Sequence, residues 1–211
     1  MQAAEGVIRF RFDHRREALP EELAALAAVL AGWRRRLVAR GVVGRDPARY
    51  GGFGFGNLSA RVAGRAGFLV TGSQTGRLPD LDLAGFALVE SWDAAAHSLT
   101  SRGLARPSSE SLTHAALYDA SAEIGAVFHV HAPALWARRG TPDLPATPTD
   151  VDYGTPAMAT AAAEIVARAP SPAGLLAMGG HEDGILAWGP TPEATGRALL
   201  AALDAAGPPT A

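Results

Sequence analysis

Phe128-His129-Val130-His131 lies near the middle of the chain and closes an apolar run that begins at Ile124. Side chains two residues apart on a β-strand point to the same face, so a strand here presents the imidazoles of His129 and His131 side by side. Two imidazoles on one face can hold a metal ion. An isolated pair of this kind is more often two core or surface histidines, so the interpretation depends on the motifs around it.

Glu110 is a further candidate for a metal site with His129 and His131. It ends the motif Pro107-Ser108-Ser109-Glu110, directly before a predicted helix over residues 111–120. The two serines are favourable helix-capping residues, which places Glu110 at a helix N-terminus. Alone, it would be interpreted as a surface carboxylate stabilised by the helix dipole. His114, one helical turn further on, is predicted to pack or to support the site rather than to bind a metal.

The third histidine of interest lies in a glycine-flanked turn. This turn, Gly179-Gly180-His181-Glu182-Asp183-Gly184, follows a short apolar strand that we predict over residues 175–178. The flanking glycines leave the turn free to project its side chains. His14 and His97 lie in polar surroundings and give no signal.

Two absences from the composition limit the chemistry. The chain has no cysteine, which excludes disulfides, thiol nucleophiles, cysteine-bound zinc and iron–sulfur clusters. It also has no lysine, because all 19 basic residues are arginine. A Schiff-base lysine and the lysine of a phosphate-binding P-loop are therefore excluded. Carbonyl chemistry in this chain needs a metal ion or another electrophile.

Length and charge indicate one globular domain over residues 1–211. The chain is 48% apolar and has a net charge of −2, which suits one core of ordinary size. Neither a signal peptide nor a run of about 18 apolar residues is present, so we expect a cytoplasmic protein without a membrane span. The near-neutral charge, with no arginine run longer than Arg34-Arg35-Arg36, argues against a nucleic-acid partner.

Hydrophobic periodicity and turn residues predict a mixture of strands and helices. An edge strand is predicted over residues 7–12, and a helix over 20–40 from its acidic start, its arginine-rich end and the stop at Gly41. The arginines of this helix end are predicted to be solvated rather than to bind a ligand. The other predicted strands are 58–62, 68–71, 86–92, 97–101, 124–130, 175–178 and 185–188, and the other helices are 111–120, 158–168 and 193–206.

The glycine-rich stretch Gly51-Gly52-Phe53-Gly54-Phe55-Gly56 superficially resembles a dinucleotide-binding fingerprint. Such a fingerprint leaves a strand and enters a helix, whereas this stretch leads into the predicted strand pair 58–62 and 68–71. We therefore expect the glycines to let an anion or another strand approach the backbone closely. The turn 71–76, which offers hydroxyls and backbone amides, is either part of a site or merely a turn.

Taken in order, these motifs resemble the class II aldolase/adducin family. The matching segments lie within residues 20–203 and are Gly56-Asn57-Leu58-Ser59-Ala60-Arg61, Thr75-Gly76, Pro107-Ser108-Ser109-Glu110, His129-Val130-His131 and His181. Each segment is a weak signal, but the ordered set is specific. The resemblance implies an α/β fold with three layers, α/β/α, around a central and mainly antiparallel sheet.

The resemblance also implies a site. Family members bind a divalent metal, usually zinc, through three histidines and an acidic residue, which correspond here to His129, His131, His181 and Glu110. In the aldolases the acidic residue is thought to leave the metal and act as the base, so Glu110 is the candidate base. Three imidazoles with one exchangeable position also match a catalytic zinc site on chemical grounds. The phosphate-binding residues of the family correspond to Asn57, Thr75, Gly76, Ser108 and Ser109.

Three features depart from the family pattern. The aldolases have a tyrosine proton donor where this chain has Thr149 and Asp150, and Tyr153 is near but out of register. Glu182 and Asp183 follow His181 where glycine is usual, and they offer another acid or base. Because the sequence ends soon after the predicted helix 193–206, we also expect no C-terminal tail of the kind that reaches a neighbouring active site in some members.

The fold and the metal are thus better determined than the reaction. Our first hypothesis is a lyase that acts on a hydroxy-ketone or a sugar (phosphate), by reversible aldol cleavage through a metal-bound enediolate. A second hypothesis keeps the metal but makes the reaction an epimerisation or a dehydration. A third is a non-catalytic, adducin-like binding module, which the missing tyrosine favours and the intact ligand set disfavours. We expect a homo-oligomer, a tetramer by resemblance, because a neighbour can supply the missing proton donor.

Overall fold

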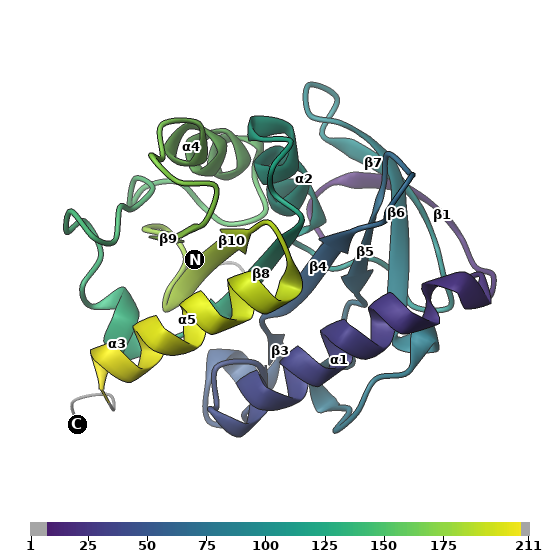
Figure 1. Cartoon of the computed structure of the whole chain (residues 1–211), viewed down its shortest axis with the longest axis horizontal. Helices are drawn as coiled ribbons and strands as arrows, with labels where there is room; N and C mark the ends of the chain where they lie inside the picture. The colour runs from purple at the N-terminus through teal and green to yellow at the C-terminus, as the bar shows by residue number, and fades with distance from the viewer. Residues whose placement is uncertain (1–7, 208–211) are drawn as a thin grey trace.

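A computed structural model describes residues 8–207, and its centre is an eight-stranded sheet with the order β1-β7-β6-β5-β4-β8-β10-β9 (Figure 1). β1 and β7 are parallel, and every other neighbouring pair is antiparallel. This confirms the predicted, mainly antiparallel sheet. The strands are β1 Arg11–Arg15, β4 Asn57–Arg61, β5 Phe68–Thr71, β6 Phe86–Asp93, β7 Ser98–Arg102, β8 Ala126–His131, β9 Gly174–Ala177 and β10 Gly184–Gly189.

Helices cover both faces of the sheet, which confirms the predicted α/β/α layers (Figure 1). On one face, α1 (Ala24–Ala39) and α5 (Pro192–Ala206) bury their leucines against the sheet. On the other face, α2 (Ser111–Ala120) and α4 (Pro156–Ala167) pack against each other over a second apolar core. The short helix α3 (Pro133–Trp136) lies beside α5. No helix within residues 8–207 is long and apolar enough to cross a membrane.

α4 and α5 begin slightly earlier than predicted, each at a Thr-Pro pair. The hydroxyl of Thr155 accepts a hydrogen bond from the amide of Met158, and that of Thr191 accepts one from Ala194. A threonine N-cap followed by proline in the first turn is a favourable helix start. The two starts are therefore determined by local capping rather than by the apolar pattern that located the helices.

The first strand is displaced from its predicted position. The prediction covered residues 7–12, of which Val7 lies outside the described residues, whereas β1 spans Arg11–Arg15. Its position follows from pairing with β7, in which Arg11 lies opposite Ser98 and Arg15 opposite Arg102. β1 is an edge strand, as predicted.

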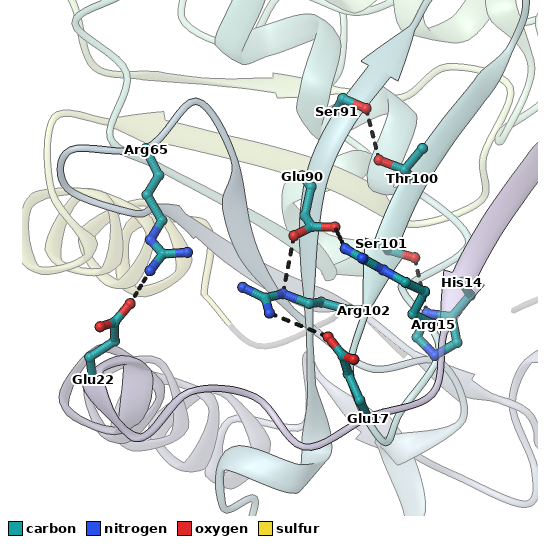
Figure 2. A network of polar contacts seen from close by, with 10 residues as sticks. All are labelled: His14, Arg15, Glu17, Glu22, Arg65, Glu90, Ser91, Thr100, Ser101 and Arg102. Atoms are coloured by element: carbon teal, nitrogen blue, oxygen red, sulfur yellow. Dashed lines mark hydrogen bonds and ion pairs between the residues drawn. The ribbon is translucent and has the colours of Figure 1, made fainter.

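Charged and hydroxyl side chains tie this edge of the sheet together (Figure 2). Arg102 pairs with Glu90 at 3.1 Å and with Glu17 at 3.3 Å, and Arg15 pairs with the other oxygen of Glu90. His14 Nδ1 lies 3.0 Å from the hydroxyl oxygen of Ser101. These cross-strand contacts add to the backbone pairing of β1, β7 and β6.

The opposite edge of the sheet is covered by the irregular segment before α4. Ala146 forms a parallel bridge with Ala177 of β9. The amide of Thr147 donates to the carbonyl of Ala177, and the amide of Ala177 donates to the carbonyl of Pro145. Backbone groups of the outer strand are therefore hydrogen-bonded on both sides.

The prediction that the arginine cluster of α1 is solvated is wrong for Arg34. Arg34 is only 2% exposed and donates hydrogen bonds to the carbonyls of Thr75, Leu78 and Pro79, at 3.1, 2.8 and 3.2 Å. Arg34 lies four residues after Leu30 and three before Leu37, so it shares their buried helix face. The helix period thus overrides the average exposure of arginine.

The glycine-rich stretch forms a small hairpin instead of a dinucleotide-binding turn. β2 (Gly44–Arg45) pairs with β3 (Gly54–Phe55), and the chain then enters the strand β4 rather than a helix. A Cβ atom on Gly56 would lie 2.8 Å from the side chain of Val43 and 3.1 Å from the carbonyl oxygen of His129. The expected close approach of this backbone to a strand is therefore confirmed.

Candidate metal centre

Strand β8 and the turn before β10 bring the three predicted histidines together. β10 pairs antiparallel with β8, and Gly184 lies opposite His131. The ring centroids are 5.0 Å apart for His129 and His131, 5.1 Å for His129 and His181, and 4.8 Å for His131 and His181. One ring nitrogen of each residue lies within 4.8 Å of the other two. All three side chains are buried, and together they can hold a metal ion.

Glu110 completes this cluster from the start of α2. Its oxygen Oε2 lies 2.9 Å from Nε2 of His129, and Oε1 lies 3.8 Å from Nε2 of His181. The side-chain nitrogen of Asn57 donates to Oε2 at 2.9 Å. The carboxylate is 1% exposed, so its charge is balanced by groups of the site and not by water.

The predicted serine caps of α2 are wrong, although the helix itself spans residues 111–120 as predicted. Glu110 occupies the N-cap position and makes no side-chain capping bond. The hydroxyl of Ser108 accepts only a long hydrogen bond, 3.4 Å, from the amide of Glu110. The carboxylate is directed to the histidines and to Asn57 instead of to the amides of its own helix.

The contact between His129 and Glu110 has a consequence for cation binding. Nδ1 of His129 lies 3.2 Å from the carbonyl oxygen of Ile185, and it must donate because a carbonyl only accepts. In a neutral imidazole, Nε2 then carries a lone pair that faces the oxygen of Glu110 at 2.9 Å. Two lone pairs at this distance repel unless a proton or a metal cation lies between them. A proton on His129 or a bound metal cation removes this repulsion, so the donor set fits a metal cation.

The charge states of the cluster suit metal binding at neutral pH. Burial lowers the pKa of His131 well below its ordinary value and lowers the pKa of His181 to about 4. Burial raises the pKa of Glu110, but the neighbouring His129, His181 and Asn57 lower it by more, to about 2. Neutral imidazoles and an ionised carboxylate are the forms that bind metals.

The other histidines lie outside this group. His114 is fully buried, and its Nδ1 lies 2.8 Å from the hydroxyl oxygen of Ser59. Burial lowers the pKa of His114 to about 3. His97 Nε2 lies 3.2 Å from the carbonyl oxygen of Gly154. His114 thus packs inside the core, where it is neutral at physiological pH.

The predicted phosphate-binding residues come from three segments of the chain. The amide of Ser73 donates to the carbonyl of Arg106, and Gly72 bridges Pro107, so the turn that carries Thr75 and Gly76 lies beside the segment leading to the two serines. Ser108 and Ser109 are both buried. Asn57 contacts Glu110, the residue after Ser109, and the hydroxyl of Thr75 donates to the carbonyl of Gly72 at 2.8 Å. Their role in phosphate binding stays a prediction.

Comparison with known proteins identifies the family. The model of the Class II Aldolase and Adducin N-terminal domain matches residues 46–206. The chain belongs to the class II aldolase and adducin family. This confirms the family resemblance of the ordered motifs, while no curated protein matches the sequence.

Solved structures of class II aldolase-like proteins share the fold. L-fuculose-1-phosphate aldolase from Thermus thermophilus is 23% identical, with 86% of this chain and 87% of that chain covered and a TM-score of 0.59. YgbL from Klebsiella pneumoniae is 20% identical, with 86% of each chain covered and a TM-score of 0.64. It is described as an aldolase, epimerase or decarboxylase. A sugar-phosphate aldolase from Thermotoga maritima is 14% identical, with 88% of this chain and 92% of that chain covered and a TM-score of 0.60.

Two aromatic residues that the sequence did not assign to the site pack against it. The ring of Tyr50 lies edge-on to His131 with centroids 4.4 Å apart, and the ring of Tyr153 lies 4.5 Å from that of His181. Tyr153, which the sequence placed out of register, therefore lies next to His181. The loop between β8 and α4 determines its position, and such a loop has no period from which a register can be predicted.

Tyr50 links the glycine-rich segment to the turn of the third histidine. Its hydroxyl donates to Oδ2 of Asp183 at 2.6 Å and accepts a hydrogen bond from Arg49 at 2.5 Å. Burial and the hydrogen bond to Asp183 raise the pKa of Tyr50 above its ordinary value. Asp183, which the sequence suggested as an extra acid or base, is thus engaged by Tyr50 and Arg49, whereas Glu182 is exposed.

Both ends of this hydrogen bond adopt left-handed backbone conformations. Tyr50 has φ = 50° and Asp183 has φ = 62°, and such conformations cost of order 1–3 kcal/mol each in non-glycine residues. Strained residues of this kind persist where surrounding contacts hold them, and they are frequent at functional sites. We infer that the link holds His131 and the His181 turn in position for a metal.

Loss of this link should weaken metal binding without removing any predicted ligand. We expect Asp183→Ala and Tyr50→Phe to reduce metal affinity about 10–100-fold, as is typical for residues that orient metal ligands. Asp183→Asn should stay within a few-fold of the parent, because asparagine tolerates positive φ and keeps an acceptor oxygen. Competition with a chelator measures the affinity. Equal affinities for the alanine and asparagine variants would show that the link does not position the site.

Proposed function

We propose that the chain is a divalent-metal-dependent lyase that performs reversible aldol cleavage of a hydroxy-ketone or a sugar phosphate. The observation that carries this proposal is the buried carboxylate of Glu110 facing three buried imidazoles. Membership of the class II aldolase and adducin family supports the proposal. Several of the structural neighbours are described as aldolases, among them three L-fuculose 1-phosphate aldolases and one sugar-phosphate aldolase.

In this proposal His129, His131 and His181 hold the metal, and zinc is the ion that best matches three imidazoles in a chain without cysteine. A bound ion supplies Lewis-acid polarisation of a substrate carbonyl or hydroxyl. Glu110 takes part first as a ligand and then, when substrate arrives, as the base that removes a proton. Asn57 donates to Oε2 of Glu110 and thereby orients the carboxylate while leaving Oε1 available.

The metal site serves equally for a related reaction. An epimerase or dehydratase can use the same three histidines and the same carboxylate, and the broad description of YgbL supports keeping this alternative. A non-catalytic adducin-like module has no need for a buried carboxylate among imidazoles. We therefore rank it third.

An activity screen on the purified, metal-loaded protein tests the proposal. Phosphorylated and free ketoses and aldoses are incubated with the protein, and NMR follows both carbon–carbon cleavage and inversion or loss of a hydroxyl group. Cleavage products that appear only with metal support the lyase. Epimers or dehydrated products support the alternative, and metal binding without any turnover of the panel supports the binding module.

We further propose that the protein is cytoplasmic and forms a homo-oligomer, with a tetramer favoured by the family resemblance. A neighbouring subunit can then supply the proton donor that is missing at Thr149 and Asp150. Analytical ultracentrifugation at micromolar concentration should show the oligomer as the active species. A fully active monomer would contradict this proposal.

A further inference from the structure

A series of polar contacts joins strand β4 to helix α2 (Figure 1), and the mechanism proposed above uses only the first of them. These contacts, the β4–α2 ladder, are Asn57 to Glu110 at 2.9 Å, Ser59 to His114 at 2.8 Å and Arg61 to the carbonyl of Tyr118 at 2.7 Å. Along the strand the partners are two residues apart, and along the helix they are four residues apart.

The dimensions of the two elements keep this ladder in step. Two residues of a strand rise about 6.6 Å, and four residues of a helix rise about 6 Å. Alternate residues of a strand point to one face, and residues four apart on a helix share one face. The register of the ladder places Glu110 opposite Asn57, which in turn pairs with His129 on β8. The position of α2 along β4 therefore determines where the carboxylate lies relative to the histidines.

The middle of the ladder is a buried cluster of three polar side chains. The hydroxyl oxygen of Ser59 lies 2.8 Å from Nδ1 of His114 and 2.7 Å from the hydroxyl oxygen of Tyr118. All three residues are buried. When such a contact breaks, no water replaces the lost partner, so the break costs more than the loss of an exposed hydrogen bond. The cluster therefore resists a shift of α2 along β4.

His114 occupies its place in this cluster at a cost. Its Nε2 is buried and has no hydrogen-bond partner within residues 8–207. A leucine would fill a similar space without burying an unpaired polar atom. The contact of Nδ1 with Ser59 gives the imidazole a role that an apolar side chain cannot perform.

Arg61 holds the other end of α2. It donates to the carbonyl of Tyr118 at 2.7 Å and to the carbonyl of Ile124 at 2.8 Å. Tyr118 lies in the last turn of the helix, where carbonyls have no partner within the helix itself. The guanidinium group also lies 4.8 Å from the centroid of the Tyr118 ring. Because α2 is tied to β4 at both ends, a slip by one turn would break all three contacts of the ladder.

We propose that Ser59, His114 and Tyr118 are positioning residues, which fix the register of α2 on β4 and thereby hold the carboxylate of Glu110 in one place beside the three histidines. The proposal rests on the proposed function, because it concerns the candidate base of that reaction. A displacement of about 1 Å can cost a catalytic group on the order of 10²-fold in rate. The three residues act through Glu110 and bind neither the metal nor the substrate.

Cobalt(II), bound in place of zinc, tests the ladder without a substrate. Its visible absorption depends on the number and kind of its ligands, so it reports whether Glu110 lies at the metal. Spectra are compared for the parent, Ser59→Ala, Glu110→Gln and the double variant. We expect each protein to bind one equivalent and Ser59→Ala to shift the band in the same direction as Glu110→Gln. The double variant should have the spectrum of Glu110→Gln, because Ser59 acts through Glu110.

Turnover of the substrate found in the screen provides a second test. Ser59→Ala should lower kcat about 10–100-fold, the usual effect of losing a residue that orients a site, with little change in KM. In the Glu110→Gln background the same substitution should cause no further loss. His114→Leu should behave like Ser59→Ala. His114→Asn, which keeps a polar group near the position of Nδ1, should retain a kcat within a few-fold of the parent.

Thr195→Val is the matched control, because it also removes a fully buried hydroxyl. Thr195 lies on α5, at the opposite face of the sheet, and donates to the carbonyl of Thr191 at 2.9 Å. Whatever its Tm, this variant should have the cobalt spectrum and the kcat of the parent. If Ser59→Ala does not fold, Tyr118→Phe, which loses one hydroxyl and keeps the ring, replaces it in both tests.

Three outcomes would overturn the proposal. They are the parent spectrum and kcat in Ser59→Ala, equal spectra for the parent and Glu110→Gln, and an effect of Ser59→Ala that persists undiminished in the Glu110→Gln background.

The same variants separate the ladder from the lyase proposal. If the screen finds no reaction but the cobalt band shifts as expected, the ladder is supported and the proposed reaction fails. If a substrate is cleaved and Ser59→Ala has the kcat of the parent, the reaction is supported and the positioning role fails.

Discussion

Replacement of Glu110 by glutamine is expected to slow turnover by about 10²–10⁴-fold, the usual contribution of a positioned base, while most of the metal remains bound. Glutamine keeps the size of the side chain and one oxygen, but it cannot accept a proton from carbon. The position is sensitive because the carboxylate is 1% exposed and lies 2.9 Å from His129. Water therefore has no easy route to replace it as the base.

The matched control for this variant is Glu182→Gln, which changes an exposed glutamate next to His181. Its turnover and its metal content should both equal those of the parent. Steady-state kinetics with the substrate found in the screen, together with elemental analysis of each protein, gives both values. If Glu110→Gln binds metal normally and turns over at the parent rate, Glu110 is not the base, and Glu182, Asp183 or Asp150 is the next residue to test.

Replacement of any one of the three clustered histidines by alanine is expected to remove both the metal and the activity. Each supplies one nitrogen to a group whose ligand atoms lie within 4.8 Å of one another. Loss of one nitrogen weakens metal binding, and a site left with two imidazoles needs Glu110 as a permanent third ligand, so that Glu110 can no longer act as the base. The metal should also stabilise the parent against heat, by about 4 kcal/mol when its free concentration is a thousand times the dissociation constant.

His97→Asn is the control for the histidine variants, because His97 lies outside the cluster and asparagine tolerates its φ of 49°. This variant should bind one equivalent of metal and show the same metal-dependent rise in Tm as the parent. The His129, His131 and His181 variants should show neither. A single alanine variant that retains full metal content would remove that histidine from the proposed ligand set.

The sequence predicted the fold well where a periodic pattern or a capping residue acts locally. The helix over residues 111–120 and the strand over residues 68–71 have the predicted ends. The alternation around His129 and His131 placed both imidazoles on one face, because side-chain direction on a strand has a fixed period. The order of the motifs then indicated which acidic residue and which third histidine would join them.

The sequence failed where a contact depends on two distant segments. Tyr50 and Asp183 are 133 positions apart, and neither has a local pattern that points to the other. The glycines before His181 were assigned to backbone freedom, but neither Gly179 nor Gly180 has a positive φ. A Cβ atom on Gly180 would instead lie 2.0 Å from the carbonyl oxygen of Val151. Only the packed structure shows that these glycines are needed for close approach.

The two edges of the sheet, β1 and β9, limit how copies of this chain can associate. Segment 145–147 already occupies the outer side of β9, and β1 carries Arg11, Asp13 and Arg15 along the opposite edge. A covered edge and a charged edge both disfavour the addition of a strand from another molecule. We therefore expect the proposed oligomer to assemble through helix and loop surfaces and not by pairing of sheet edges.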